Sequence, residues 1–214
     1  MCADAAEAAL AAHVAALAGG LYSADSFHQP GFFDAARECL SRYAGAKDPE
    51  EADLRQKACL ANWMRKQGAT PYAIAFMRYA SAPAAISAVR VYGPVSVVRA
   101  AMLWADASEG WTIVGRSGDI VPLWTPPDLD SDSAFHKFRA AHADASLWPA
   151  ALTWPRVVAR SDGGRELDFN FAVKTCHACA DLGIATIGYV FSADGDFVAM
   201  HLIRIVSEPA PAQQ

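Results

Sequence analysis

No apolar run in this sequence is long enough to cross a membrane as a helix. A helical span needs ~20 apolar residues, whereas the longest apolar segments, Val95–Trp104 and Ile184–Phe191, have the length of strands. Basic residues are not in excess either, because 18 Lys and Arg stand against 23 Asp and Glu, for a net charge of −5. Nucleic-acid-binding surfaces are usually basic. We therefore expect no transmembrane segment and no nucleic-acid partner.

Several signatures of catalysis and cofactor binding are also missing. The sequence has no G-x-x-x-x-G-K-[ST] phosphate loop, no G-x-G-x-x-G after a strand, no H-E-x-x-H and no G-x-S-x-G. These absences lower the odds of several large enzyme classes, so we lean toward a protein that is not an enzyme and expect no cofactor. The composition, 53% hydrophobic and 19% charged, is typical of a soluble chain with a packed core.

The first 80 residues have a helical pattern. Leucine and valine recur at helical spacing near the N-terminus, between Leu10 and Leu21, in an alanine-rich background. A later helix has a clear start, with Asp48 as N-cap, Pro49 at its first position and Glu51 placed to complete a capping box. The ranges expected for the helices after the first are 32–43, 49–67 and 71–79. A strand is the alternative for the last of these, because the segment contains aromatic and β-branched residues.

From about Ala84 the pattern changes to strands separated by turns. A four-strand antiparallel meander is expected first, and two hairpins follow it. The polar, proline-containing connection 125–132 is the best candidate boundary, which gives units 1–127 and 128–214 or one continuous domain. A helix from Ala134 to about Ala145, capped by Ser133, lies between the two strand sets. We therefore predict an α+β protein with one antiparallel sheet or two; the expected strands are 86–92, 95–104, 111–116, 120–124, 156–160, 166–175, 184–191 and 197–206.

The five cysteines cannot all pair within one chain. Cys2 stands where the lipidated cysteine of a mature bacterial lipoprotein would stand, which leaves two pairs among the others. Two pairs suit an oxidising, extracytoplasmic compartment, and a cytoplasmic chain is the alternative. Cys39 and Cys59 lie on successive predicted helices. Their offset in a straight hairpin is awkward for a bridge, so a bridge between steeply crossing helices and two buried thiols are both open.

The most informative motif is Cys176-His177-Ala178-Cys179. Such a pair closes a small disulfide ring, binds a metal, or serves a thiol–disulfide oxidoreductase with Cys176 as nucleophile. A metal site would have to recruit His142 or His201 from elsewhere. Redox enzymes place this motif at the start of a helix, but only three residues separate Cys179 from Gly183. A structural disulfide that stiffens a loop is therefore the main interpretation.

The order of elements between Phe169 and Leu202 resembles the vertebrate-lysozyme inhibitor family. In that family a disulfide-closed loop carrying a histidine enters the lysozyme active site. The matching positions are Cys176, His177 and Cys179, although this loop has two residues between its cysteines where the family has four. The resemblance covers about thirty residues. It implies an extracytoplasmic binding protein with a rigid loop.

We therefore interpret the chain as a binding or inhibitor module of the bacterial envelope. Its predicted site consists of Cys176, His177 and Cys179, and its predicted partner is another protein. One alternative is the thiol–disulfide oxidoreductase. Another is a small-molecule binding domain whose pocket is lined by tryptophans at strand ends, namely Trp104, Trp111 and Trp124.

Overall fold

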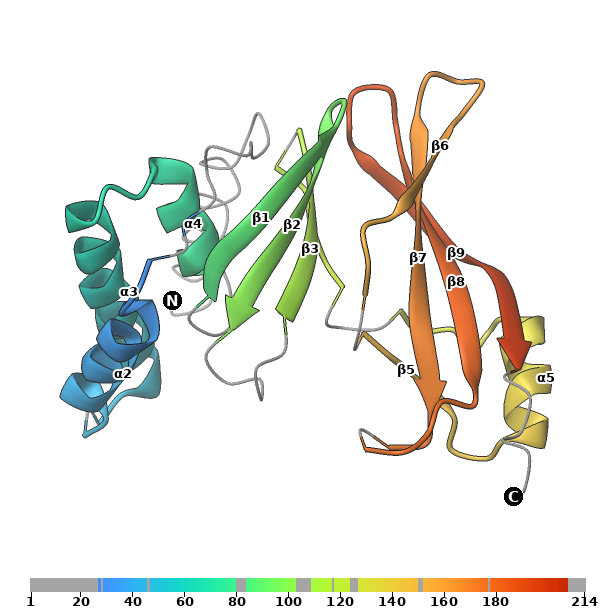
Figure 1. The fold of residues 1–214 in the computed structure, drawn as a ribbon, viewed down its shortest axis with the longest axis horizontal. Helices are drawn as coiled ribbons and strands as arrows, with labels where there is room; N and C mark the ends of the chain where they lie inside the picture. The colour runs from blue at the N-terminus through green and yellow to red at the C-terminus, as the bar shows by residue number, and fades with distance from the viewer. Residues whose placement is uncertain are drawn as a thin grey trace. The chain divides into compact units, whose positions relative to one another are not determined.

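The structure is a computed structural model of the 214-residue chain. It describes residues 27, 29–45, 47–79, 84–102, 109–116, 118–123, 127–149, 152–176 and 178–207. The chain divides into two compact units, residues 1–121 and 122–214. The expected helix near Leu10–Leu21 lies outside the described residues. Helices precede antiparallel strands, so the α+β prediction is confirmed (Figure 1).

Three helices of the first unit fall where the sequence predicts them. They are α2 (Phe32–Tyr43), α3 (Pro49–Lys66) and α4 (Pro71–Tyr79). The side chain of Asp48 accepts hydrogen bonds from the backbone N–H groups of Glu50 and Glu51, so the predicted N-cap is confirmed. The Glu51 carboxylate pairs with Arg55 on the next turn. The capping box therefore has one of its two expected halves.

A disulfide between Cys39 and Cys59 joins α2 to α3. The two Cα atoms lie 5.8 Å apart, within the ~4.4–6.8 Å range of disulfides. At the start of α2, the ring of Phe32 meets that of Trp63 near the end of α3, with 6.2 Å between centroids. The helices thus pair so that Cys39 faces Cys59, which decides between the bridge and the free thiols left open by the sequence.

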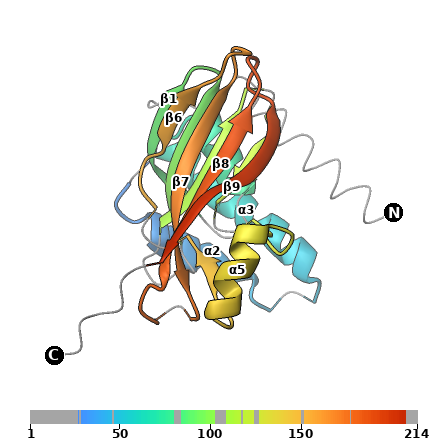
Figure 2. The same cartoon turned by 90° about the vertical axis from the view of Figure 1, so that its right-hand side faces the viewer.

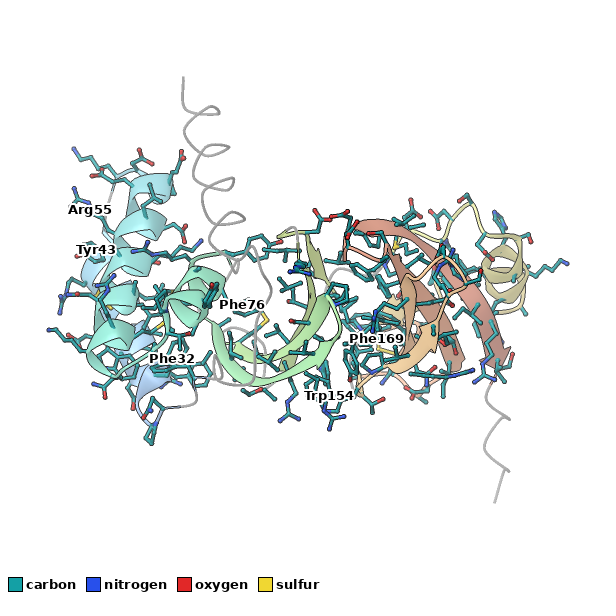
Figure 3. All side chains as sticks on the ribbon, turned by 90° about the horizontal axis from the view of Figure 1, so that it is seen from above. Phe32, Tyr43, Arg55, Phe76, Trp154 and Phe169 are labelled. Atoms are coloured by element: carbon teal, nitrogen blue, oxygen red, sulfur yellow. A yellow bond between two sulfur atoms is a disulfide. The ribbon has the colours of Figure 1, made fainter. Side chains whose placement is uncertain are left out.

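The core of the first unit forms where α4 packs against the sheet. Phe76 is fully buried on α4, and α4 contacts β1 (Figure 3). Apolar residues of α2 and α3 belong to the same core cluster, including Phe32, Leu60 and Met64. At ~25 cal/mol per Å² of apolar surface removed from water, side chains of this size supply most of the driving force for folding.

The sheet of the first unit is the predicted meander. Among the described residues its strands are β1 (Ala84–Tyr92), β2 (Val95–Met102), β3 (Glu109–Gly115) and β4 (Ile120–Pro122), in that order. β1 pairs with β2, and β2 with β3, in antiparallel register. The turn between β1 and β2 contains Gly93, whose φ of 64° lies in the left-handed region that glycine adopts without strain.

The second unit contains a separate antiparallel sheet. Its described strands are β5 (Ser146–Trp148), β6 (Arg156–Ala159), β7 (Arg165–Lys174), β8 (Gly183–Phe191) and β9 (Phe197–Ser207). The order is β5-β7-β8-β9, and β6 pairs with the other half of β7. Both predicted hairpins are confirmed. The strand β5, which has three residues, was not predicted from the sequence.

The helix of the second unit, α5 (Ser133–Ala141), is shorter than predicted and begins differently. Asp132, not Ser133, is its N-cap, because the Asp132 carboxylate accepts hydrogen bonds from the N–H groups of Ala134 and Phe135. The expected end at Ala145 is also wrong, since His142 leaves the helical conformation. α5 lies beside β9 (Figure 2).

Burial along β7 alternates as expected for a strand with one buried face. The buried side chains are Leu167, Phe169, Phe171 and Val173. Apart from Ala172, the intervening positions carry polar residues, namely Glu166, Asp168, Asn170 and Lys174. Residues paired across antiparallel strands point to the same face of a sheet. Residues of β8 and β9 that pair in register with β7 therefore continue its buried face and its polar face.

Candidate functional site

The predicted loop joins the end of β7 to the start of β8. The register pairs Val173 with Gly183, so the connection is residues 175–182. The backbone N–H of Leu182 donates to the carbonyl of Val173 over 2.7 Å, which closes the base of the loop. The sheet therefore fixes both ends of the segment that carries the cysteine motif.

Cys176 and Cys179 form a disulfide, with Cα atoms 5.1 Å apart. Cys176 is exposed and Cys179 is partly exposed. Inside the ring, the N–H of Cys179 donates to the carbonyl of Cys176 over 3.2 Å. The third predicted site residue, His177, lies outside the described residues. The structure thus places the two cysteines together on the surface.

Side chains brace the base of this loop from both sides. Lys174 Nζ lies 2.8 Å from Asp181 Oδ1, which ties the end of β7 to the residues before β8. From β5, the Ser146 hydroxyl and the Trp148 indole N–H both donate to the carbonyl of Lys174, over 3.3 and 3.4 Å. The short strand β5, absent from the sequence prediction, therefore supports the loop. A loop held in this way loses little conformational entropy when it binds.

Exposed apolar side chains adjoin the loop. Ile184 and Val206 face each other on β8 and β9 and are 40% and 52% exposed. They lie next to the pair Gly183–Ser207, at the end of the sheet from which the loop emerges. Further exposed apolar residues on β9 include Phe197, Val198, Met200 and Ile203. Phe197 and Met200 lie on the other face of the sheet, so the apolar surface at the loop is the pair Ile184 and Val206.

The geometry of the cysteine pair bears on its possible chemistry. Residues 178–182 form no helix, and β8 begins at Gly183. A helix N-terminus would lower the pKa of a cysteine thiol in an oxidoreductase, and this loop does not provide one. While the disulfide is formed, neither sulfur is a thiolate that could bind zinc. Among the described residues, no group of three or more His, Cys, Asp or Glu is arranged to hold a metal ion.

The tryptophans proposed as a pocket lining are not brought together in the described part of the chain. Trp104 and Trp124 lie outside the described residues. Trp111 lies on β3 and is only 4% exposed, so its ring fills the protein interior. Trp63, which was not part of that proposal, does line a surface groove.

A cluster of charged side chains on the polar face of β7 was missed by the sequence analysis. Glu166 and Asp168 point to the same face, and His201 approaches them from β9, with Nε2 3.7 Å from Glu166 Oε1. Burial raises the pKa of the Asp168 carboxyl above its ordinary value, and the adjacent Glu166 raises it further. The alternation of polar residues along β7 is a signal for this face, but the approach of His201 depends on strand register.

None of the helices in the described ranges combines the length and apolarity that a membrane crossing requires. The proposed lipid anchor, Cys2, lies outside the described residues. The chain matches no protein-family model, no curated protein and no solved structure.

Proposed function

We propose that this chain is a binding or inhibitor module of the bacterial envelope that contacts another protein through the loop closed by Cys176 and Cys179. The observation that carries the proposal is that this loop is both exposed and held in place. Its disulfide is on the surface, and its base is held by the Lys174–Asp181 ion pair and by the backbone bond from Leu182 to Val173. Preorganised loops of this kind bind with a small entropic cost.

The surface beside the loop supports the same proposal. Ile184 and Val206 provide apolar area where the loop meets β8, and Asp181 and Lys174 provide charge at the loop base. Protein interfaces combine an apolar centre with a polar rim. A partner that covers the Cys176–Cys179 ring and this apolar pair would meet both.

The proposed location is outside the cytoplasm, with Cys2 as a lipid attachment point. The two disulfides, Cys39–Cys59 and Cys176–Cys179, support an oxidising compartment, because cytosolic thiols are kept reduced. The resemblance to the lysozyme-inhibitor family suggests one partner to try first. Inhibition of a vertebrate-type lysozyme by the intact chain, and not by Cys176→Ser/Cys179→Ser, is the result expected for that partner.

The exposed position of Cys176 also keeps a thiol–disulfide oxidoreductase as a second candidate. The reduction potential of the pair separates the two functions. In a Cys2→Ser variant, alkylation and mass spectrometry at defined glutathione ratios read each disulfide separately. A potential below about −300 mV, typical of structural disulfides, supports the binding module. A potential between about −120 and −270 mV, the range of known oxidoreductases, would contradict it.

A further inference from the structure

A groove with many basic side chains lies on the helical part of the first unit. Its volume is about 550 Å³, within the ~300–1,000 Å³ range of small-molecule sites. The charged residues that line it are Arg42, Arg65, Lys66, Arg78 and Glu38. Four cations thus face one carboxylate, in a chain whose net charge is −5.

Residues of all three helices line the groove. Glu38 and Arg42 are four residues apart on α2, as are Asn62 and Lys66 on α3, so the members of each pair share a helix face. Arg78 comes from the last turn of α4. The positive charge of the groove is therefore a product of the tertiary fold and not of one basic segment.

The carboxylate in the groove is already neutralised. Arg42 Nη2 lies 2.7 Å from Glu38 Oε1. Arg65 Nη1 donates to the Asn62 side-chain oxygen over 3.1 Å, which orients the guanidinium and leaves its other N–H groups available. Neither Lys66 nor Arg78 has an ion-pair partner within the described ranges. The groove thus has an excess of positive charge that an anion would balance.

Covalent and aromatic contacts hold the walls of the groove in place. The Cys39–Cys59 disulfide, which belongs to the lining, fixes the separation of α2 and α3. Trp63, another lining residue, is held edge-on by Phe27, with ring centroids 6.1 Å apart. Tyr43, labelled in Figure 3, also lines the groove. Because these walls are held in place, little conformational entropy is lost in ordering the site when a ligand binds.

We propose that this groove binds a small ligand through an oxyanion group, a phosphate or a carboxylate. A guanidinium presents parallel N–H donors that match two oxygens of either group, and a lysine adds a point charge. The bonds would come from Arg65, Lys66 and Arg78. This site does not depend on the Cys176–Cys179 loop, which lies in the other unit.

The competing explanation is that these cations only offset the helix dipoles. Arg42, Arg65, Lys66 and Arg78 all lie in the last turns of their helices, where positive charge is favourable. That explanation predicts an effect on stability and none on anion binding. It also assigns no role to the hollow that the three helices enclose.

The test is an NMR titration of the full chain with inorganic phosphate and, separately, with citrate, at constant ionic strength set by chloride. Saturable shifts confined to α2, α3 and the end of α4 are expected for at least one of the two anions. Binding of phosphate alone, or of citrate alone, identifies the oxyanion class. The double variant Lys66→Gln/Arg78→Gln should bind at least about tenfold more weakly, a loss of ~1.4 kcal/mol.

Two further variants separate binding from folding. Glu38→Gln removes the carboxylate and frees Arg42, so it should bind the anion more tightly than the unaltered chain, which no folding defect produces. Arg55→Gln is the matched control, because Arg55 lies on α3, pairs with Glu51 and is not part of the groove lining. Linear shifts with both anions, or equal weakening in Arg55→Gln, would overturn the proposal.

Discussion

Glu166 and His201 meet across an intervening strand. Their side chains lie 3.7 Å apart, Oε1 to Nε2, although β8 separates β7 from β9. Strands two places apart are about 10 Å from each other. The gap closes over Gly188, where an added Cβ would lie 2.9 Å from Glu166 Oε1 and 3.1 Å from His201 Cε1. The absence of a side chain at this position is what assembles the charged cluster.

Replacement of Gly188 by alanine should uncouple this pair. In a double-mutant cycle with Glu166→Gln and His201→Gln, we expect a coupling free energy of up to ~1 kcal/mol. In the Gly188→Ala background the coupling should vanish, because the Cβ separates the two side chains. Urea unfolding measures each variant. A coupling that persists in the alanine background would contradict this role of Gly188.

Asp168 should make the stability of the chain depend on pH. Burial and the neighbouring Glu166 raise the pKa of Asp168, against a smaller opposing effect of Arg156 and His201. The folded state therefore binds this proton more tightly than the unfolded chain. The resulting stability is present below the ordinary pKa of 3.8 and is lost as pH rises through the higher folded-state value.

The variant Asp168→Asn has no carboxyl to titrate at this position. The free energy of unfolding of the variant, minus that of the unaltered chain, should therefore be larger at about pH 7 than at about pH 3. Urea unfolding at a series of pH values gives the difference. If the difference between the two proteins is the same at every pH, Asp168 does not titrate as described.

Gly183 should be intolerant of any side chain. An added Cβ would lie 2.4 Å from the carbonyl oxygen of Val206 and 3.2 Å from the ring of Phe138. The first neighbour is backbone and cannot turn aside, so Gly183→Ala should destabilise the second unit by ~1–3 kcal/mol. Gly45 is the control, because an added Cβ there has no neighbour within 4 Å. Thermal unfolding that affects both variants equally would contradict the packing described.

The two disulfides should contribute unequally to stability. Cys39 and Cys59 are 20 residues apart in sequence, whereas Cys176 and Cys179 are 3 apart. By loop-closure entropy the longer loop stabilises by ~3 kcal/mol and the shorter by ~2 kcal/mol. Urea unfolding of Cys39→Ala/Cys59→Ala and of Cys176→Ser/Cys179→Ser should therefore show the larger loss in the first variant. A larger loss of stability in Cys176→Ser/Cys179→Ser would contradict the prediction.

Most helices and strands could be predicted from local patterns in the sequence. The features that were missed depend on contacts between residues distant in the sequence. The hairpin turns could be predicted because glycines such as Gly163 and Gly195 adopt positive φ there. The strand β5 pairs with residues 24 to 28 positions away and has no local pattern. Asp132 and Ser133 are both good caps, and only the backbone geometry chooses between them.

The same distinction applies to the candidate sites. The small ring at Cys176 could be proposed because both partners lie in one motif. The Cys39–Cys59 bridge depends on how two helices cross, which the sequence does not state. The basic groove needs three helices to converge, and the Glu166–His201 pair needs the register of three strands. Neither could be predicted from spacing along the chain.

Photo-crosslinking from the loop, in the cells that produce the chain, tests most directly whether the loop contacts another protein. A photo-reactive phenylalanine analogue replaces Ala178, which is exposed between the paired cysteines. The control places the same analogue at Ala193, an exposed residue in the turn between β8 and β9. We predict one discrete crosslinked protein from position 178, absent from position 193 and weakened by Cys176→Ser/Cys179→Ser. Identical products from both positions, or none from position 178, would contradict a binding role for the loop.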